Sequence, residues 1–176
     1  MLSRAFSTAV IAGALSLAVA SGFAQQAPAA NPLDAVPEKM PFDVPYGTPI
    51  TLERAEAAIG AAVAEAKGKG WKLVVAVMDS GGNLVALQRM DGAQLGSIVI
   101  AEHKARAAAM FRRDTKVAET GIQSGFNYLL TLDGIIGSRG GIPLIEGGKL
   151  IGSIGCSGGT GSQDEVACKA GAALIK

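Results

Sequence analysis

The sequence predicts an α/β domain of the α+β type, in which two β-hairpins form a mainly antiparallel central sheet that is flanked by helices. Two pairs of apolar segments are each separated by a turn rich in glycine, and several other segments have apolar stripes at helical spacing. Hairpins join antiparallel strands, and helices with one apolar stripe need a sheet face to cover. A chain of 176 residues is long enough for one such domain.

The first 24 residues have the pattern of an export signal. Arg4 supplies a basic start, residues 9–20 are continuously apolar, and the small residues Gly22 and Ala24 allow cleavage after Ala24. The apolar run is shorter than the roughly 20 residues that a membrane span needs. We therefore predict a cleaved signal peptide over residues 1–24, no membrane span after processing, and a periplasmic or secreted mature protein.

Residues 25–49 contain six of the seven prolines of the chain. Proline disfavours both helix interiors and central strands, so this segment is expected to be an extended arm or a linker. The folded domain is then predicted to comprise residues 50–176.

The domain is predicted to open with a helix that Thr51 caps and that ends near Gly68. Residues 72–78 are rich in valine and predict a buried strand. Residues 84–89 predict a second strand, and the turn formers between the two segments make them a hairpin.

Two helices are expected next. Ser97 can cap a helix over residues 98–111, and either Asp114 or Thr115 can cap a third, short helix. Residues 127–138 fit either a strand or a loop.

The last third of the chain predicts a second hairpin followed by a helix. Its strands are residues 140–145 and 149–156, joined by a turn that contains two glycines. A glycine-rich loop follows, and then Ser162 and Glu165 have the spacing of a capping box for a helix that reaches Ile175.

Composition excludes several classes of function. The whole chain has 16 basic and 15 acidic residues, and residues 1–24 contain one basic residue and no acidic one, so the mature chain is balanced at 15 and 15. This balance, together with an aromatic fraction of 5%, predicts that nucleic acid is not a partner. One histidine and two separated cysteines do not make a zinc site.

The two cysteines, Cys156 and Cys168, are predicted on a strand and on the following helix. In an oxidising compartment they could form a disulfide if the helix folds back on the strand. They could equally be two small buried hydrophobic residues, which is the form that we favour.

Several short motifs, taken jointly, resemble those of a known family. They are M-D-x-G-G-N-L-V-A at 78–86, R-M-D-G-A at 89–93, G-G-I-P at 140–143 and G-x-I-G-x-S-G-G at 152–159. With these motifs, residues 50–176 resemble the GlcG/HbpS-like haem-binding family. The resemblance implies an antiparallel sheet between helices, a homo-oligomer, and haem binding or iron handling in exported members.

His103 is the candidate axial and metal ligand, because haem iron can be held by one protein side chain. Lys104 and Arg106 are candidates to pair with the haem propionates, and Met110 is a second soft ligand. His103 and Met110 are seven residues apart, about 10 Å along one helix, so both cannot bind one iron from a single copy. The family pattern K-A-x-T-A has a threonine where this chain has Ala107, which puts any role of that hydroxyl in doubt.

Two other functions are consistent with the sequence. One is an enzyme or accessory protein that acts on a small hydroxy acid or cofactor, of the glycolate-utilisation type, although we expect a binding protein rather than a catalyst. Its pocket would be formed by Asp79, Arg89 and Lys104 near the turn of Gly140, Gly141 and Pro143. The other is an assembly or sensory module that binds no ligand.

Overall fold

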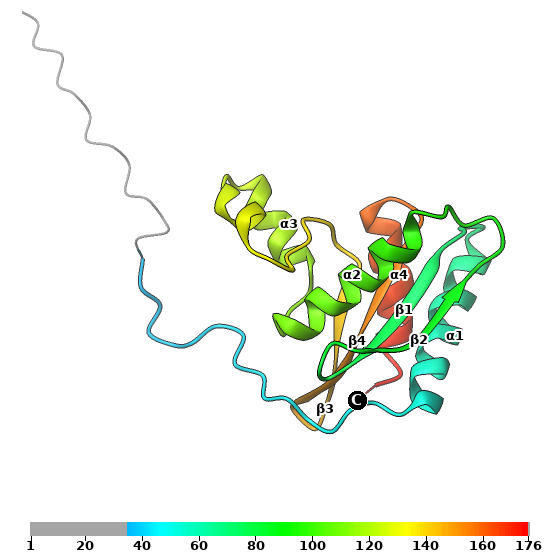
Figure 1. Ribbon diagram of the computed structural model, residues 1–176, viewed down its shortest axis with the longest axis horizontal. Helices are drawn as coiled ribbons and strands as arrows, with labels where there is room; N and C mark the ends of the chain where they lie inside the picture. Colours follow the sequence, from blue (N-terminus) through cyan, green and yellow to red (C-terminus); the bar gives the residue numbers. More distant parts are fainter. Residues whose placement is uncertain (1–34, 176) are drawn as a thin grey trace, which may run out of the picture. The chain divides into compact units, whose positions relative to one another are not determined.

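The computed structural model describes residues 35–175, and the fold comprises residues 39–175 of these. The sheet has four antiparallel strands in the order β2-β1-β4-β3 (Figure 1), which confirms the predicted fold class. The elements are α1 (Leu52–Gly68), β1 (Val74–Asp79), β2 (Leu84–Arg89), α2 (Ser97–Met110), α3 (Lys116–Gln123), the 3-10 helix η2 (Asn127–Thr131), β3 (Gly141–Glu146), β4 (Lys149–Ser157) and α4 (Gly161–Ala172). The predicted signal peptide and the first part of the arm lie outside the described residues.

The two predicted hairpins are present, and β1 and β4 join them in the middle of the sheet. In β1, Val74 pairs with Arg89 of β2 on one side and with Ser157 of β4 on the other. In the second hairpin, Glu146 pairs with Lys149, so the turn between them has only two residues. These are two glycines with positive φ, at 55° and 75°, and only glycine adopts such a turn without strain.

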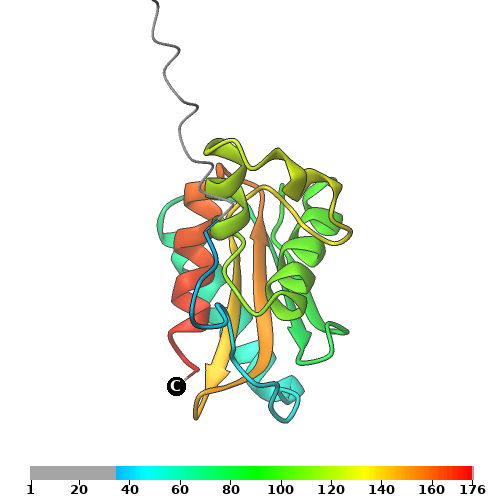
Figure 2. The same cartoon turned by 90° about the vertical axis from the view of Figure 1, so that its left-hand side faces the viewer.

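Helices cover both faces of the sheet (Figure 2). Side chains of a strand alternate between the faces, so Val75 and Val77 point towards α1 and α4. Val74, Ala76 and Met78 point the other way and pack against α2. The central strand β1 is thereby buried on both sides.

The helix α2 packs unusually close to the sheet because two glycines lie beneath it. A Cβ atom on Gly155 of β4 would collide with the carbonyl oxygen of Ala101, and one on Gly141 of β3 would collide with that of Lys104. The hydroxyl of Ser153 donates a hydrogen bond of 2.6 Å to the carbonyl oxygen of Ala105. The inner side of α2 is therefore fixed to the backbone of the sheet.

The described end of the proline-rich arm lies on the sheet of its own chain. The amide of Leu150 donates to the carbonyl oxygen of Pro45 at 2.8 Å, and the amide of Gly47 donates to that of Leu150 at 2.7 Å. Tyr46 forms a parallel bridge with Leu150. The pairing of β1 with β4 ends at Asp79, which lies opposite Gly152. The arm therefore pairs with the residues of β4 that precede Gly152.

Two of the predicted helix caps are wrong. The N-cap of α2 is Gly96, while Ser97 is buried and its hydroxyl accepts a hydrogen bond from Ser157. The helix α4 is capped by Thr160 and Gln163, not by Ser162 and Glu165, and it ends at Ala172 rather than at Ile175. Thr160 has the extended backbone of an N-cap, with φ −71° and ψ 157°, whereas Ser162 already lies inside the helix.

The other predicted caps are confirmed or resolved. Thr51 accepts a hydrogen bond from the amide of Arg54, as expected for α1. Of the two candidates for α3, Thr115 is the N-cap residue but its side chain makes no capping hydrogen bond. Asp114, one residue earlier, supplies that bond, because its Oδ1 accepts from the amide of Lys116 at 2.8 Å. The ambiguous residues 127–138 form η2 and turns, with no strand.

Candidate functional site

The candidate ligands on α2 fall on two sides of the helix. His103, Arg106 and Met110 lie on the outward side, together with Val99 and Ile100. We call these five residues the α2 face. Lys104 follows His103 directly, so its side chain is turned by about 100° around the helix axis and points into the protein.

His103 is half-buried, and its ring is held by the loop that precedes β3. Nε2 lies 3.3 Å from the carbonyl oxygen of Gly134. When Nε2 carries the proton and donates to this oxygen, Nδ1 keeps a lone pair. Histidine ligands of metals are held in the same way, by a hydrogen bond from the nitrogen that does not bind the metal.

Apolar side chains surround His103 on the α2 face. Val99 and Ile100 precede it by one helical turn and are 67% and 38% exposed, and Met110 is 51% exposed. Large aliphatic side chains exposed together on one helix face are typical of a surface that binds an apolar partner or ligand.

Arg106 provides a positive charge beside these apolar residues. Its Nε donates to the carbonyl oxygen of Gly82 at 3.1 Å, which holds the side chain over the turn between β1 and β2. Its two terminal nitrogens have no hydrogen-bond partner among residues 35–175. The α2 face thus combines an imidazole, apolar side chains and a guanidinium with free donors.

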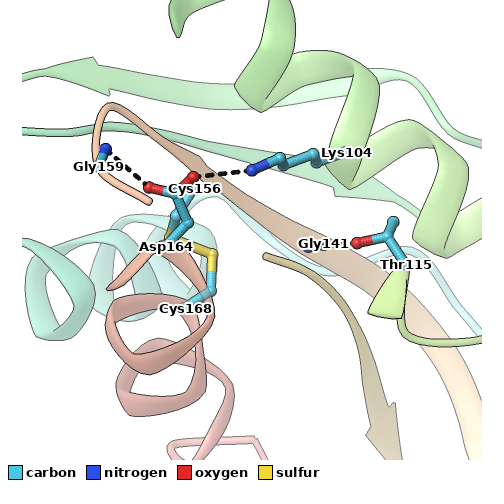
Figure 3. The surroundings of a disulfide bond; sticks show 7 residues. All are labelled: Lys104, Thr115, Gly141, Cys156, Gly159, Asp164 and Cys168. Carbon is cyan, nitrogen blue, oxygen red and sulfur yellow. Dashed lines mark hydrogen bonds and ion pairs between the residues drawn. A yellow bond between two sulfur atoms is a disulfide. The ribbon is translucent and has the colours of Figure 1, made fainter. Parts of the chain in front are cut away.

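Lys104 belongs to a buried ion pair. Its Nζ lies 2.8 Å from Oδ2 of Asp164 on α4, and the side chains are 1% and 3% exposed. The other oxygen of Asp164 accepts from the amide of Gly159 at 3.0 Å (Figure 3). Lys104 therefore ties α2 to α4, and its amine does not reach the α2 face or the solvent.

The predicted turn at Gly140 and Gly141 is filled by neighbouring protein groups. The hydroxyl of Thr115 accepts a hydrogen bond from the amide of Gly141 at 3.0 Å, and the amide of Thr115 donates to the carbonyl oxygen of Gly141. A Cβ atom on Gly140 would lie 3.3 Å from Nζ of Lys104. The structure thus brings Lys104 to this turn, as a packing contact.

The other residues of the predicted acid pocket lie elsewhere. Asp79 is at one end of β1 and Arg89 pairs with Val74 at the other end, about 17 Å away at the usual rise of a strand. Pro143 pairs with Ser153 inside the sheet. Asp79, Arg89 and Lys104 are consequently not assembled around one ligand.

Asp79 is explained by its turn. Its Oδ1 accepts hydrogen bonds from the amides of Gly81, at 2.8 Å, and Asn83, at 2.9 Å. Partial burial raises the pKa of Asp79, but the hydrogen bonds from Asn83, Gly81 and Gly82 outweigh it, so the pKa lies below its usual value. This carboxylate is a structural acceptor in the hairpin.

Cys156 and Cys168 form a disulfide, so the preference for unpaired cysteines was wrong. The bond joins β4 to α4 across a Cα–Cα distance of 5.7 Å (Figure 3). Both cysteines are fully buried among the residues under α1 and α4. The physical reason is that α4 folds back over β4, the strand that precedes it, and this brings the two cysteines together.

A cluster of charges at the base of α3 was missed in the sequence. The guanidinium of Arg139 lies 2.8 Å from Oε1 of Glu119 on α3 and 3.4 Å from Oε2 of Glu165 on α4. The hydrogen bond from Arg139 is the main cause that lowers the pKa of Glu119, and Lys169 has the same effect on the pKa of Glu165. No local motif marks this cluster, since Glu119 and Glu165 lie 20 and 26 residues from Arg139 in sequence.

Within residues 35–175, no group of three or more His, Cys, Asp or Glu side chains could hold a metal ion. The helices of this described part are also too short or too polar to cross a membrane.

Comparison with known proteins identifies relatives over the whole fold. The family model described as "Haem degrading protein HbpS-like" matches residues 50–173. Protein GlcG of Escherichia coli is 38% identical over 108 residues, which cover 61% of this chain and 81% of that protein. An uncharacterised 15.0 kDa protein from the dhaT-dhaS intergenic region of Citrobacter freundii is 38% identical over 121 residues, covering 66% and 85%.

Solved structures share the fold. A double mutant of HbpS from Streptomyces reticuli has a TM-score of 0.68 and 32% identity, covering 85% of this chain and 99% of that one. A complex of PduOC with haem has a TM-score of 0.67 and 26% identity, covering 73% and 96%.

Proposed function

Because the chain belongs to the HbpS-like family of haem-degrading proteins, we propose that it is an exported haem-binding protein whose α2 face holds the haem. The observation that carries the proposal is the arrangement of His103, whose ring is hydrogen-bonded to Gly134, with the exposed Val99 and Ile100 one helical turn before it. A haem-bound structure of one relative, PduOC, supports the ligand class.

The residues of the α2 face fit the three chemical parts of haem. An imidazole nitrogen can bind the iron. The exposed aliphatic side chains can cover part of the apolar macrocycle. The free donors of Arg106 can pair with a propionate, since charge-assisted hydrogen bonds to carboxylates are strong.

The position of the family threonine supports His103 as the ligand in this chain. Ala107, which stands there, is buried, and it lines a small void with Phe111, Ile135 and Ile136. A side chain at that position points under the loop rather than onto the α2 face. His103 lies four residues earlier and faces outwards.

One copy of the α2 face offers a single axial ligand. Met110 is about 10 Å from His103 along the helix axis, too far to bind the same iron. We propose that the second axial position is taken by solvent or by another copy of the chain in a homo-oligomer.

Two independent features support export. The first 24 residues have the pattern of a signal peptide. The chain also contains a buried disulfide, and such bonds persist in oxidising compartments such as the periplasm.

The test is a titration of the oxidised, mature protein with hemin, followed by absorbance in the Soret region. We expect a saturable shift at one haem per chain, lost or altered in His103→Ala and recovered when free imidazole is added to that variant. Glu102→Ala, on the same helix, serves as the matched control and is expected to behave as the wild type. A wild type without a saturable shift would contradict haem binding, and an unchanged spectrum in His103→Ala would contradict the ligand.

A further inference from the structure

A groove between α3 and η2 lies apart from the α2 face and has no role in the proposed haem site. Its volume is about 530 Å³, within the range of pockets that hold small molecules. Its lining includes Arg113, Val117, Thr120, Phe126, Tyr128 and Leu129. No residue of the α2 face lines it.

The walls of the groove are mostly apolar because α3 is not packed on the sheet. This helix lies beside η2 and away from the strands (Figure 1), and Ala118 is its one buried residue. Val117 of α3 is 40% exposed, and it lines the groove together with Leu129. The rings of Phe126 and Tyr128, with centroids 6.5 Å apart, complete the wall.

One end of the groove carries a fixed positive charge. The guanidinium of Arg113 lies 3.8 Å from the centre of the Phe42 ring, and its Nε donates to the carbonyl oxygen of Phe111 at 2.9 Å. Its two terminal nitrogens have no hydrogen-bond partner in the part of the chain that the structure describes. The side chain is thus held in place with the N–H groups of both terminal nitrogens free to donate.

The other charged groups at the groove already have partners. Lys116 pairs with Glu165 at 3.4 Å, and the carboxylate of Asp114 caps α3. Burial raises the pKa of Asp114 and lowers the pKa of Arg113. An anion beside Arg113 would offset its desolvation, and the position of Asp114 limits the ligand to one anionic group.

We propose that this groove is a second ligand site, which takes a small aromatic carboxylate. The carboxylate accepts hydrogen bonds from the terminal nitrogens of Arg113, and the ring lies between Val117, Phe126 and Leu129. The size of the groove favours a small molecule over a peptide. Among the described residues that line it, Arg113 is the one cation without an ion-pair partner, which favours a monoanion. The site does not depend on haem binding.

The first experiment compares two probes of the same shape by calorimetry, 3-phenylpropionate and its neutral amide. The carboxylate is expected to bind about tenfold more tightly, the usual effect of a hydrogen bond to a charged group. Arg113→Gln should remove this preference. Arg112→Gln removes the same charge one residue away, outside the groove, and should leave the preference for the carboxylate unchanged. Equal binding of the two probes by the wild type would overturn the proposal.

The second experiment blocks the groove without using Arg113. Val117→Trp fills it and should abolish binding of 3-phenylpropionate, whereas Val166→Trp, at an equally exposed valine on α4, should not. Circular dichroism verifies that both variants fold. Unchanged binding in Val117→Trp would overturn the proposed location.

A third measurement separates this site from the proposed haem site. Protein saturated with hemin should bind 3-phenylpropionate with unchanged affinity. Competition at one hemin per chain would show that the groove itself holds the haem, and would overturn a second site.

Discussion

Arg106 and Lys104 are two residues apart on α2, but the side chain of Arg106 is exposed and that of Lys104 is buried. Their opposite burial leads to two different expectations. Arg106 has free donors on the α2 face, so its substitution should affect a ligand. Lys104 has its partner inside the protein, so its substitution should affect stability.

Arg106→Gln is expected to weaken the binding of hemin about tenfold, because a charge-assisted hydrogen bond to a propionate is lost. The matched ligand is hemin dimethyl ester, whose propionates carry no charge. Wild type and variant should bind the ester equally in a Soret titration. If both ligands lose affinity to the same extent, Arg106 acts through packing and not through the propionate.

Lys104→Met is expected to lower the free energy of unfolding by about 3–5 kcal/mol, since it leaves the buried carboxylate of Asp164 without its counter-charge. Urea denaturation measures the change. The control is Lys69→Met, which removes an exposed pair with Glu65 and should cost about 1 kcal/mol or less. Equal losses in the two variants would contradict the structural role of the buried pair.

Among the elements, α3 is held to the rest of the fold mainly by polar contacts. The pair of Glu119 with Arg139 is the best formed of these, with an additional hydrogen bond of 2.6 Å from the amide of Arg139 to the carboxylate. This pair makes the attachment of α3 dependent on pH.

Glu119→Gln is expected to lower stability at neutral pH and to have progressively less effect in acid. The pKa of Glu119 is lowered in the folded protein, chiefly by the hydrogen bond from Arg139. The stability that the ionised carboxylate of Glu119 contributes is therefore complete above the pKa of this group in the unfolded chain, about 4.3. It is lost as the pH falls through the lower pKa of the folded protein.

Urea denaturation of wild type and variant from pH 3 to pH 7 measures this difference. The pKa of Asp114 is raised by burial, so its titration changes stability with pH in the opposite direction. Both proteins contain Asp114, and its effect therefore cancels in the difference between them. Glu65→Gln, in an exposed pair, is the control. A gap between the wild type and Glu119→Gln that does not close below about pH 4 would contradict the assignment.

The sequence predicted elements better than their ends. Apolar periodicity located the four helices and both hairpins, because burial on one side dominates those segments. The start of α4 was misplaced because Thr160 and Ser162 both precede a suitable partner three residues later, and only the backbone conformation distinguishes them.

The candidate site was predicted in part. His103 and Arg106 lie on one helix face because they are three residues apart. The burial of Lys104 could not be predicted, since it depends on Asp164, 60 residues away.

For the whole molecule, the disulfide is the one covalent cross-link within the described fold. It closes a segment of 12 residues between β4 and α4. A bond over a loop of this size restricts the unfolded chain and stabilises the folded state by about 2–4 kcal/mol.

Replacing both cysteines, Cys156→Ala with Cys168→Ala, should therefore lower the free energy of unfolding by about 2–4 kcal/mol. Thermal and urea unfolding of the oxidised wild type and the double variant measure it. Because both sulfurs are buried, a reductant without denaturant should leave the wild type as stable as before. A native protein that loses stability at once in the reductant would contradict a buried bond.

The close contact of α2 with Gly141 and Gly155 has a consequence for how members of this fold diverge. The strand positions under the helix allow almost no substitution, since a methyl group on Gly141 or Gly155 would push the helix off the sheet. On the outer side of the helix, Val99, Arg106 and Met110 are exposed and can change one residue at a time without repacking the core. Substitutions on the α2 face can therefore change the chemistry of this surface while the packing of the helix on the sheet stays the same.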